Sequence, residues 1–256
     1  MDFYAFLPSN ASTDLYPENK TSNYKIQLSK RIDLTGRWQI SLVEAHYPNT
    51  FAQVTEGENK ITLKHKNGEQ DTHFVQTGYY ARVNDFIFAL HEALTPIESL
   101  PESKGRSSVV QLSHDNHILF HPFQNCLEST YSFSPRLAMQ LGLTYAGPYP
   151  AKTELCGQNP VDLSLGIPPQ LLIYFDKIAD QICGHYRVPL LRTVPTDTTA
   201  RYGSSSIYRF EQPLYLDLNT KCFDTIEINI RDHTRKLAPF THGTSMLVVH
   251  FKPLGE

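Results

Sequence analysis

Short segments of the chain alternate between apolar and more polar residues. The alternation is clearest at residues 226–231, where three isoleucines are separated by Glu, Asn and Arg, and it recurs at residues 24–28, 38–42, 60–64 and 214–218. A period of two is the pattern of a β-strand with one buried face. We therefore predict a β-sheet protein with a core that includes Trp38, Ile40, Leu42, Leu216, Ile228, Ile230, Val249 and Phe251.

Three other segments have different patterns. Residues 171–175 are apolar on both faces, which predicts a central strand. Residues 83–94 place their apolar side chains at helical spacing and predict a short helix. The segment 134–142 predicts a second helix, with Ser134 as its cap, Pro135 in the first turn and Gly142 at its end.

These elements predict an antiparallel β-sandwich of about eight strands, with short helices in its connections. Strands and helices do not alternate along the chain, so a parallel α/β fold is not expected. The 28 Tyr and Phe residues and 17 Pro residues also favour strands broken by turns. Residues 96–108 and 193–206 are predicted loops. Predicted strands with the same alternating pattern lie on both sides of each loop, so we do not expect either loop to link two domains.

Charge and hydropathy exclude several classes of protein. The net charge is −3, without the basic excess of a general nucleic-acid binder, so direct nucleic-acid binding is not expected. No window approaches 18 uninterrupted apolar residues, and the first residues do not form a signal peptide. We expect no membrane span and no secretion. Arg231, Arg235 and Lys236 gather between two predicted strands, either as a solvated loop or as a contact for nucleic acid or an acidic partner surface.

No motif predicts a catalytic, cofactor-binding or metal-binding residue. His114, His117 and His121 lie close in sequence, but the chain has no His-x-His pair of the kind that jelly-roll metalloenzymes use. Gly-x-Ser-x-Gly and the Gly-rich nucleotide loops are also absent. Asp176 and Asp180 are expected to pair with Lys177 or Arg187. The four cysteines, Cys126, Cys156, Cys183 and Cys222, are widely spaced, and we expect free, mostly buried thiols.

A series of longer motifs extends over most of the chain. In order, they are Phe6-Leu7-Pro8-Ser9-Asn10, Tyr16-Pro17-Glu18-Asn19, Ile32-Asp33-Leu34-Thr35-Gly36-Arg37-Trp38, Leu42-Val43-Glu44-Ala45-His46-Tyr47-Pro48, Gly78-Tyr79-Tyr80, Ser134-Pro135-Arg136-Leu137, Pro189-Leu190-Leu191-Arg192 and Ile226-Glu227-Ile228-Asn229-Ile230-Arg231-Asp232 with Pro239-Phe240. Together they resemble the minor capsid (penton) protein of Maverick/Polinton elements and of related adintoviruses and virophages. Two positions depart from the family: Phe51 stands where Trp is frequent, and Thr234-Arg235-Lys236 occupies a turn where Gly is common.

The resemblance implies a single jelly-roll capsid domain over residues 1–256 with loop insertions, and no enzyme activity. It also implies a homopentamer at each vertex of an icosahedral virion, in contact with a double-jelly-roll major capsid protein, and assembly inside the host cell. A double jelly roll would need roughly twice this length. Two alternatives remain open: a glycan- or receptor-binding jelly-roll module, and a jelly-roll enzyme. A pentamer in solution, a glycan-array hit and a bound metal would distinguish the three.

Overall fold

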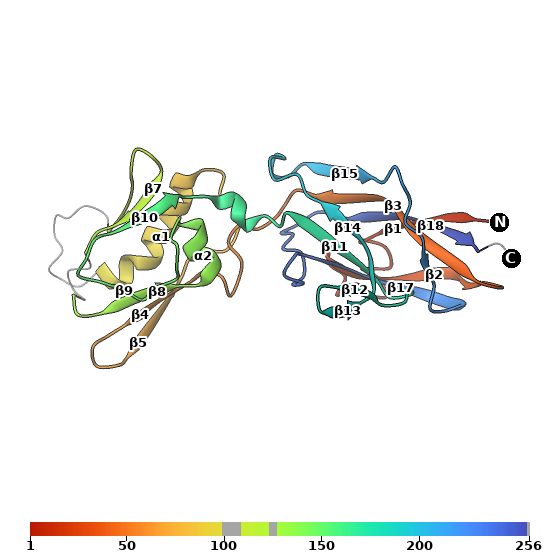
Figure 1. Cartoon of the computed structure of the whole chain (residues 1–256), viewed down its shortest axis with the longest axis horizontal. Coiled ribbons are helices and arrows are strands. Elements are labelled where there is room, and N and C mark those ends of the chain that lie inside the picture. Colours follow the sequence, from red (N-terminus) through yellow and green to blue (C-terminus); the bar gives the residue numbers. More distant parts are fainter. Residues whose placement is uncertain (99–108, 123–126, 255–256) are drawn as a thin grey trace. The chain divides into compact units, whose positions relative to one another are not determined.

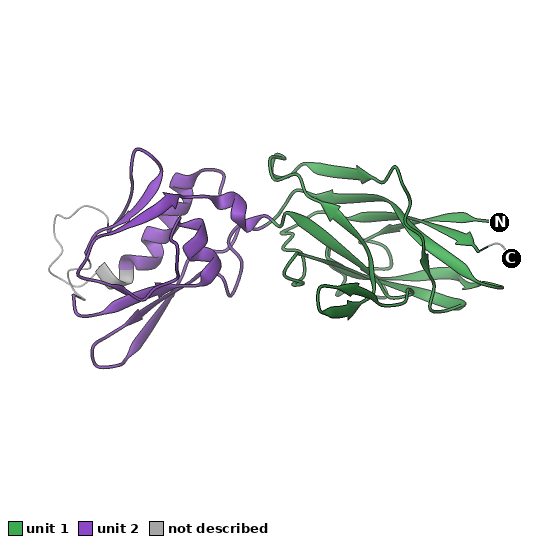
Figure 2. Ribbon diagram, viewed as in Figure 1, with its two compact units in different colours: residues 1–51, 168–256 green, residues 52–167 purple. Residues whose placement is uncertain are grey.

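The structure is a computed structural model that describes residues 1–98, 109–122 and 127–254 (Figure 1). The chain forms two compact units (Figure 2). Unit 1 comprises residues 1–51 and 168–256, and unit 2 is the continuous segment 52–167 inserted between them.

Unit 1 is built from two antiparallel sheets. The first has the strand order β1 (Phe3–Pro8), β18 (Met246–Pro253), β3 (Trp38–Pro48) and β15 (Ser205–Arg209), and β16 (Leu216–Asp217) also pairs with β3. The second has the order β14 (Leu190–Pro195), β11 (Gln170–Phe175), β17 (Cys222–Arg231) and β2 (Asn23–Asp33). A separate hairpin pairs β12 (Gln181–Cys183) with β13 (Tyr186–Val188).

The order of the strands is that of a jelly roll. If the eight main strands of unit 1 are numbered along the chain, the two sheets have the orders 1-8-3-6 and 5-4-7-2. Each sheet thus alternates between strands from the beginning and the end of the chain, as in two interlocked Greek keys. The predicted all-β jelly-roll sandwich is confirmed.

The inward side chains of the two sheets form the core of unit 1. Six of the eight predicted core residues, among them Ile228 and Phe251, are fully buried. The other two, Trp38 and Leu216, are only half-buried, so these two predictions are wrong. Trp38 lies at the end of its sheet, opposite Pro253, and Leu216 belongs to a two-residue edge strand. The predicted central strand is confirmed, because β11 lies between β14 and β17.

Unit 2 contains two further sheets and the helices. One sheet has the order β5 (Gln70–Phe74), β4 (Lys60–Lys64), β8 (Thr130–Phe133) and β9 (Tyr149–Pro150). The other has the order β10 (Leu155–Pro160), β7 (His117–Phe120) and β6 (Val110–Leu112). Their buried residues form a core of their own, which includes Phe86, Leu90, Ile118, Phe120, Leu137 and Leu141. The resemblance implied loop insertions in one domain, whereas residues 52–167 form a compact unit rather than a loop.

Both predicted helices are present. The first, α1 (Val83–Glu98), buries Phe86, Leu90 and Leu94. It includes residues 96–98, which were predicted as loop, and residues 99–108 lie outside the described part of the chain. The second, α2 (Pro135–Gln140), begins at its proline as predicted. Ser134, however, does not cap it through its side chain, because the hydroxyl oxygen accepts a hydrogen bond from the Lys60 backbone N–H at 3.2 Å.

A short 3-10 helix, η2 (Leu163–Gly166), lies near the end of unit 2. Gly166 lies so close to the backbone of Gln53 that a Cβ atom built on it would be 2.2 Å from the Gln53 carbonyl oxygen. The two ends of the inserted segment therefore pack against each other, through Gln53 and Gly166. No helix in the described ranges is long and apolar enough to span a membrane.

One buried tyrosine joins the two sheets of unit 1. The Tyr24 hydroxyl, on β2, donates a hydrogen bond to the Leu7 carbonyl oxygen, on β1, at 3.1 Å. Burial is the main cause that raises the pKa of Tyr24. The neutral phenol is therefore a structural element of the folded sandwich.

We expect Tyr24→Phe to lower the free energy of unfolding by about 1 kcal/mol at pH 8, because it removes this hydrogen bond. In the unfolded chain the pKa of Tyr24 is about 10, and in the folded protein it is higher. The stability that depends on the neutral phenol is therefore complete below pH 10 and is lost as the pH rises toward the pKa of Tyr24 in the folded protein. The difference between wild type and variant should therefore shrink above pH 10. Urea unfolding at several pH values measures it, and a constant difference would contradict this role of Tyr24.

Candidate interaction surface

Three large apolar side chains are exposed on the outward face of one sheet of unit 1. On β1, Ala5 and Leu7 point into the core, so Tyr4 and Phe6 point outward, and they are 57% and 65% exposed. Ile207 on β15 is 54% exposed and lies opposite His46 of β3. We call the outward side chains of the sheet β1-β18-β3-β15 the outer face of the first sheet. Tyr4 and Phe6 lie on one edge strand of this sheet, and Ile207 lies on the other. Aromatic side chains are enriched at protein interfaces.

A hydrogen-bonded histidine fixes one end of this face. The His250 ring lies 2.8 Å from the Tyr215 hydroxyl through Nδ1 and 3.1 Å from the Asp2 carboxylate through Nε2. The ring of Tyr4 stacks on the same imidazole, with 4.4 Å between the ring centroids. His250 is itself buried. Tyr4 is thus held in place on the surface instead of moving freely.

A charged group lies beside β15 on the same face. The Glu44 carboxylate, on β3, is 3.0 Å from His46 Nε2 and accepts a hydrogen bond from Arg209 Nε at 2.9 Å. The hydrogen bond with His46 first, and that with Arg209 next, lower the pKa of Glu44. The guanidinium of Arg209 remains largely exposed. Its other nitrogens are therefore accessible to a second acidic group.

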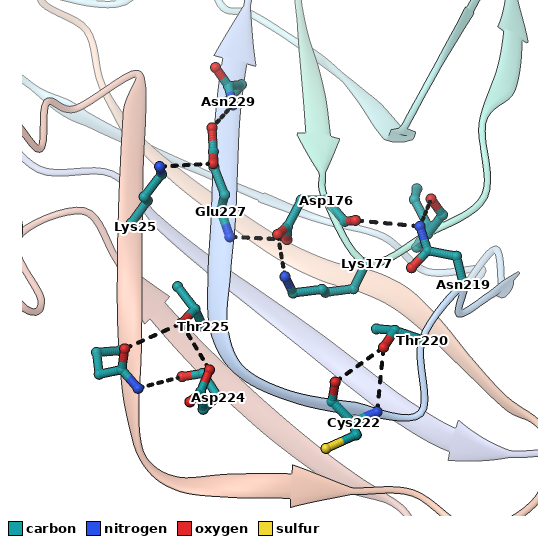
Figure 3. Close-up of polar contacts among 12 residues, drawn as sticks. Lys25, Asp176, Lys177, Asn219, Thr220, Cys222, Asp224, Thr225, Glu227 and Asn229 are labelled. Atoms are coloured by element: carbon teal, nitrogen blue, oxygen red, sulfur yellow. Dashed lines mark hydrogen bonds and ion pairs between the residues drawn. The ribbon is translucent and has the colours of Figure 1, made fainter.

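The outer face of the second sheet is different, because its groups are polar and paired with one another (Figure 3). Lys25 and Glu227 form an ion pair of 3.3 Å across β2 and β17. The Asp176 carboxylate accepts a hydrogen bond from the Glu227 backbone N–H at 3.0 Å and pairs with Lys177. The Asp176–Lys177 pairing is one of those predicted. These contacts join neighbouring strands and give the acidic groups a structural role.

Two arginines of the predicted basic cluster lie over aromatic rings. The Arg231 guanidinium lies 5.5 Å from the ring centroid of Tyr174, and that of Arg235 lies 3.4 Å from the centroid of Tyr186. Arg231 also donates a hydrogen bond to the Arg235 carbonyl at 2.8 Å. Stacking of this kind stabilises a guanidinium without an anionic ligand. These contacts give Arg231 and Arg235 a role within the fold.

The three neighbouring histidines do not converge. His117 Nδ1 lies 2.8 Å from the Gly157 carbonyl oxygen, His121 pairs with Glu154 at 3.2 Å, and His114 lies 3.7 Å from Asp115. Each histidine thus has a separate neighbour. Among the described residues, no three His, Cys, Asp or Glu side chains form a group that could hold a metal ion.

Three of the four cysteines fall within the described residues, and all three are free. Cys126 lies outside them. The prediction that the cysteines are mostly buried is wrong for these three, because Cys156 is exposed and the other two are half-buried. A hydrogen bond with Asp33 raises the pKa of the Cys222 thiol, and Arg31 Nε donates to its sulfur atom. This environment favours the protonated thiol over the reactive thiolate.

We expect thiol counting under denaturing, non-reducing conditions to find four free thiols in freshly purified protein. The reason is that four cysteines in 256 residues are too few for a disulfide scaffold, and the three described ones are unpaired in the structure. The same count after full reduction is the control. Two or fewer reactive thiols before reduction would contradict the expectation.

A shallow groove of about 590 Å³ in unit 2 is lined by Met139, Leu143, Asn159, Pro160, Val161, Asp162 and Leu165. Most of this lining is apolar. The Asp162 carboxylate already accepts hydrogen bonds from the Ser164 backbone N–H and hydroxyl, at 2.9 and 2.6 Å. It is thus engaged in capping the short 3-10 helix, so the groove presents an apolar surface rather than a reactive group.

Comparison with known proteins identifies the fold. No protein-family model and no curated protein sequence matches the chain. Among solved structures, the crystal structure of the selenomethionine-labelled mavirus penton protein matches with a TM-score of 0.53 and 11% sequence identity. The match covers 99% of this chain and 100% of the other. The chain therefore has a penton-like fold, and the resemblance seen in its sequence is confirmed at the level of the fold.

Proposed function

We propose that this chain is a structural capsid protein, the penton subunit that forms homopentamers at the vertices of an icosahedral virion. The observation that carries the proposal is the extent of the structural match, which includes nearly all of both chains. The sequence motifs that resemble penton proteins occur in both units of the chain and support the same role independently.

The surfaces of unit 1 suit such an assembly. A five-fold vertex needs five identical head-to-tail contacts, each related to the next by a rotation of about 72°. In a jelly roll, both sheets turn one face to the core and leave the other available to neighbours. Here the outer face of the first sheet exposes Tyr4, Phe6 and Ile207 beside charged groups, whereas that of the second sheet is polar and internally paired. A head-to-tail contact requires two different surfaces on each subunit, and unit 1 offers them.

The remaining expectations follow from the same role. We expect the ring to contact a double-jelly-roll major capsid protein, to be assembled inside the host cell and to be found in the virion. We expect no catalytic activity and no cofactor. A net charge of −3 for each subunit opposes the association of five copies only weakly.

The oligomeric mass in solution tests the proposal. We expect native mass spectrometry and light scattering of the full chain, over a wide concentration range, to show a species of five times 29.2 kDa. A specific interface of this kind should bury on the order of 1,200–2,000 Å² per contact. A stable trimer, or a symmetric dimer as the end point of association, would contradict the penton role.

A further inference from the structure

The sheet β1-β18-β3-β15 has two free edges. In the described part of the chain, β1 pairs only with β18 and β15 pairs only with β3. A free edge exposes a row of backbone N–H and C=O groups that can pair with another strand, and proteins usually protect it with charges or prolines. β1 contains no charged residue, and its one proline is its last residue. The exposed aromatic rings of Tyr4 and Phe6 also lie on this strand.

The two free edges have opposite polarity. Every pairing in the sheet is antiparallel, so β1 and β3 run in one direction and β18 and β15 in the other. A second copy related by rotation about an axis along the strands keeps these directions. Its β1 would then meet β15 of the first copy in antiparallel orientation, which continues the hydrogen-bonding pattern of the sheet.

The side chains of the two edges are complementary in that orientation. Outward residues must face outward residues, and on β15 these are Ser205, Ile207 and Arg209. If Ile207 lies opposite Tyr4 of the next copy, Arg209 lies opposite its Asp2. The first pair joins a β-branched residue to an aromatic ring, and the second joins opposite charges; both kinds of pair stabilise antiparallel strands. Arg209 and Asp2 are each well exposed in the single chain, where Arg209 already pairs with Glu44 and Asp2 with His250.

We propose that β15 of one copy pairs antiparallel with β1 of the next, with Ile207 beside Tyr4 and Arg209 beside Asp2. The occupant of each edge is thus a second copy of this chain. The number of copies in the ring rests on the proposed function, whereas the edge contact rests on the strand polarity and the side chains described above. The pairing is heterologous, because one edge meets a different edge, as a closed ring requires.

Disulfide cross-linking tests the contact directly. Directly opposite residues of antiparallel strands have Cα atoms about 4.5–5.5 Å apart, within the range of a disulfide. Tyr4→Cys combined with Ile207→Cys should therefore give covalent multimers up to five chains under mild oxidation. The two positions lie on opposite edges of one sheet, with β18 and β3 between them, so they cannot cross-link within a chain. Each single variant, and Tyr4→Cys combined with Ile182→Cys, serve as controls.

Charge reversal provides a second test that needs no new cysteine. Arg209→Asp and Asp2→Arg should each weaken association roughly tenfold, and the double variant should restore most of the loss. Ile207→Lys should weaken it at least as much. Ile182→Lys is the matched control, because Ile182 is 78% exposed on the separate β12–β13 hairpin. Circular dichroism and thermal melting establish that each variant is folded.

The outcomes separate this contact from the penton role. A pentamer that neither cross-links in the double-cysteine variant nor responds to Arg209→Asp would overturn the edge pairing and leave the penton role intact. Cross-links that stop at another number or extend without limit would support the edge pairing and contradict the penton role. A chain that neither cross-links nor associates at any concentration would contradict both.

Discussion

Replacing Ile228 with aspartate should lower the free energy of unfolding of unit 1 by at least about 3 kcal/mol. Ile228 is fully buried at the centre of β17, between Phe175 of β11 and Tyr24 of β2. A carboxylate there would lose its hydration without gaining a cationic partner. The variant should therefore unfold at a much lower urea concentration, or fail to accumulate as folded protein.

Glu227→Gln is the matched control for this substitution. Glu227 adjoins Ile228 on the same strand, but its side chain points outward and forms an exposed ion pair with Lys25. Exposed ion pairs contribute about 0–1 kcal/mol, so the loss should be small. If the two variants were destabilised equally, the assignment of inward and outward faces on β17 would be wrong.

The core of unit 1 could be predicted because local alternation reports directly on burial in a half-buried strand. The prediction of buried residues failed at Trp38 and Leu216, where the alternation is just as regular. Both lie where the sheet ends, and the end of a sheet is determined by long-range pairing. The inserted unit was missed for a related reason. Its strands have the same period of two as those of unit 1, so no change in pattern marks residues 52 and 167.

The outer face of the first sheet shows the same limit of local pattern. Residues 3–7 and residues 171–175 are both apolar on their two faces. The second segment became the central strand β11, whereas the first became the edge strand β1 and exposes Tyr4 and Phe6. Nothing within five residues distinguishes an edge from a centre, because the difference is the presence of a second neighbouring strand. The candidate contact residues on β1 could therefore be identified only once the order of the strands in the sheet was known.

A substitution in unit 2 should have an effect comparable to that of Ile228→Asp. Gly142 follows α2 with a φ of +74°, and the N–H of the next residue, Leu143, donates to the Ala138 carbonyl at 2.9 Å. This closes the end of the helix in a conformation that favours glycine. The Gly142 carbonyl also accepts a hydrogen bond from the Asn159 N–H at 2.9 Å, which brings the helix end against β10.

Gly142→Ala should therefore lower the free energy of unfolding by about 3 kcal/mol or more, from two additive causes. The left-handed backbone conformation costs an alanine about 1 kcal/mol. In addition, a Cβ atom on residue 142 would lie 1.9 Å from the Asn159 carbonyl oxygen, so the helix end must separate from β10. Gly68→Ala isolates the first cause, because Gly68 has a φ of +90° and no atom within 4 Å of its added Cβ. Denaturant unfolding of both variants measures the difference, and hydrogen exchange should show faster opening around α2 only in Gly142→Ala. If the two variants were destabilised equally, β10 would move away from residue 142 without lowering the free energy of unfolding. Close packing would then not hold the helix end in place.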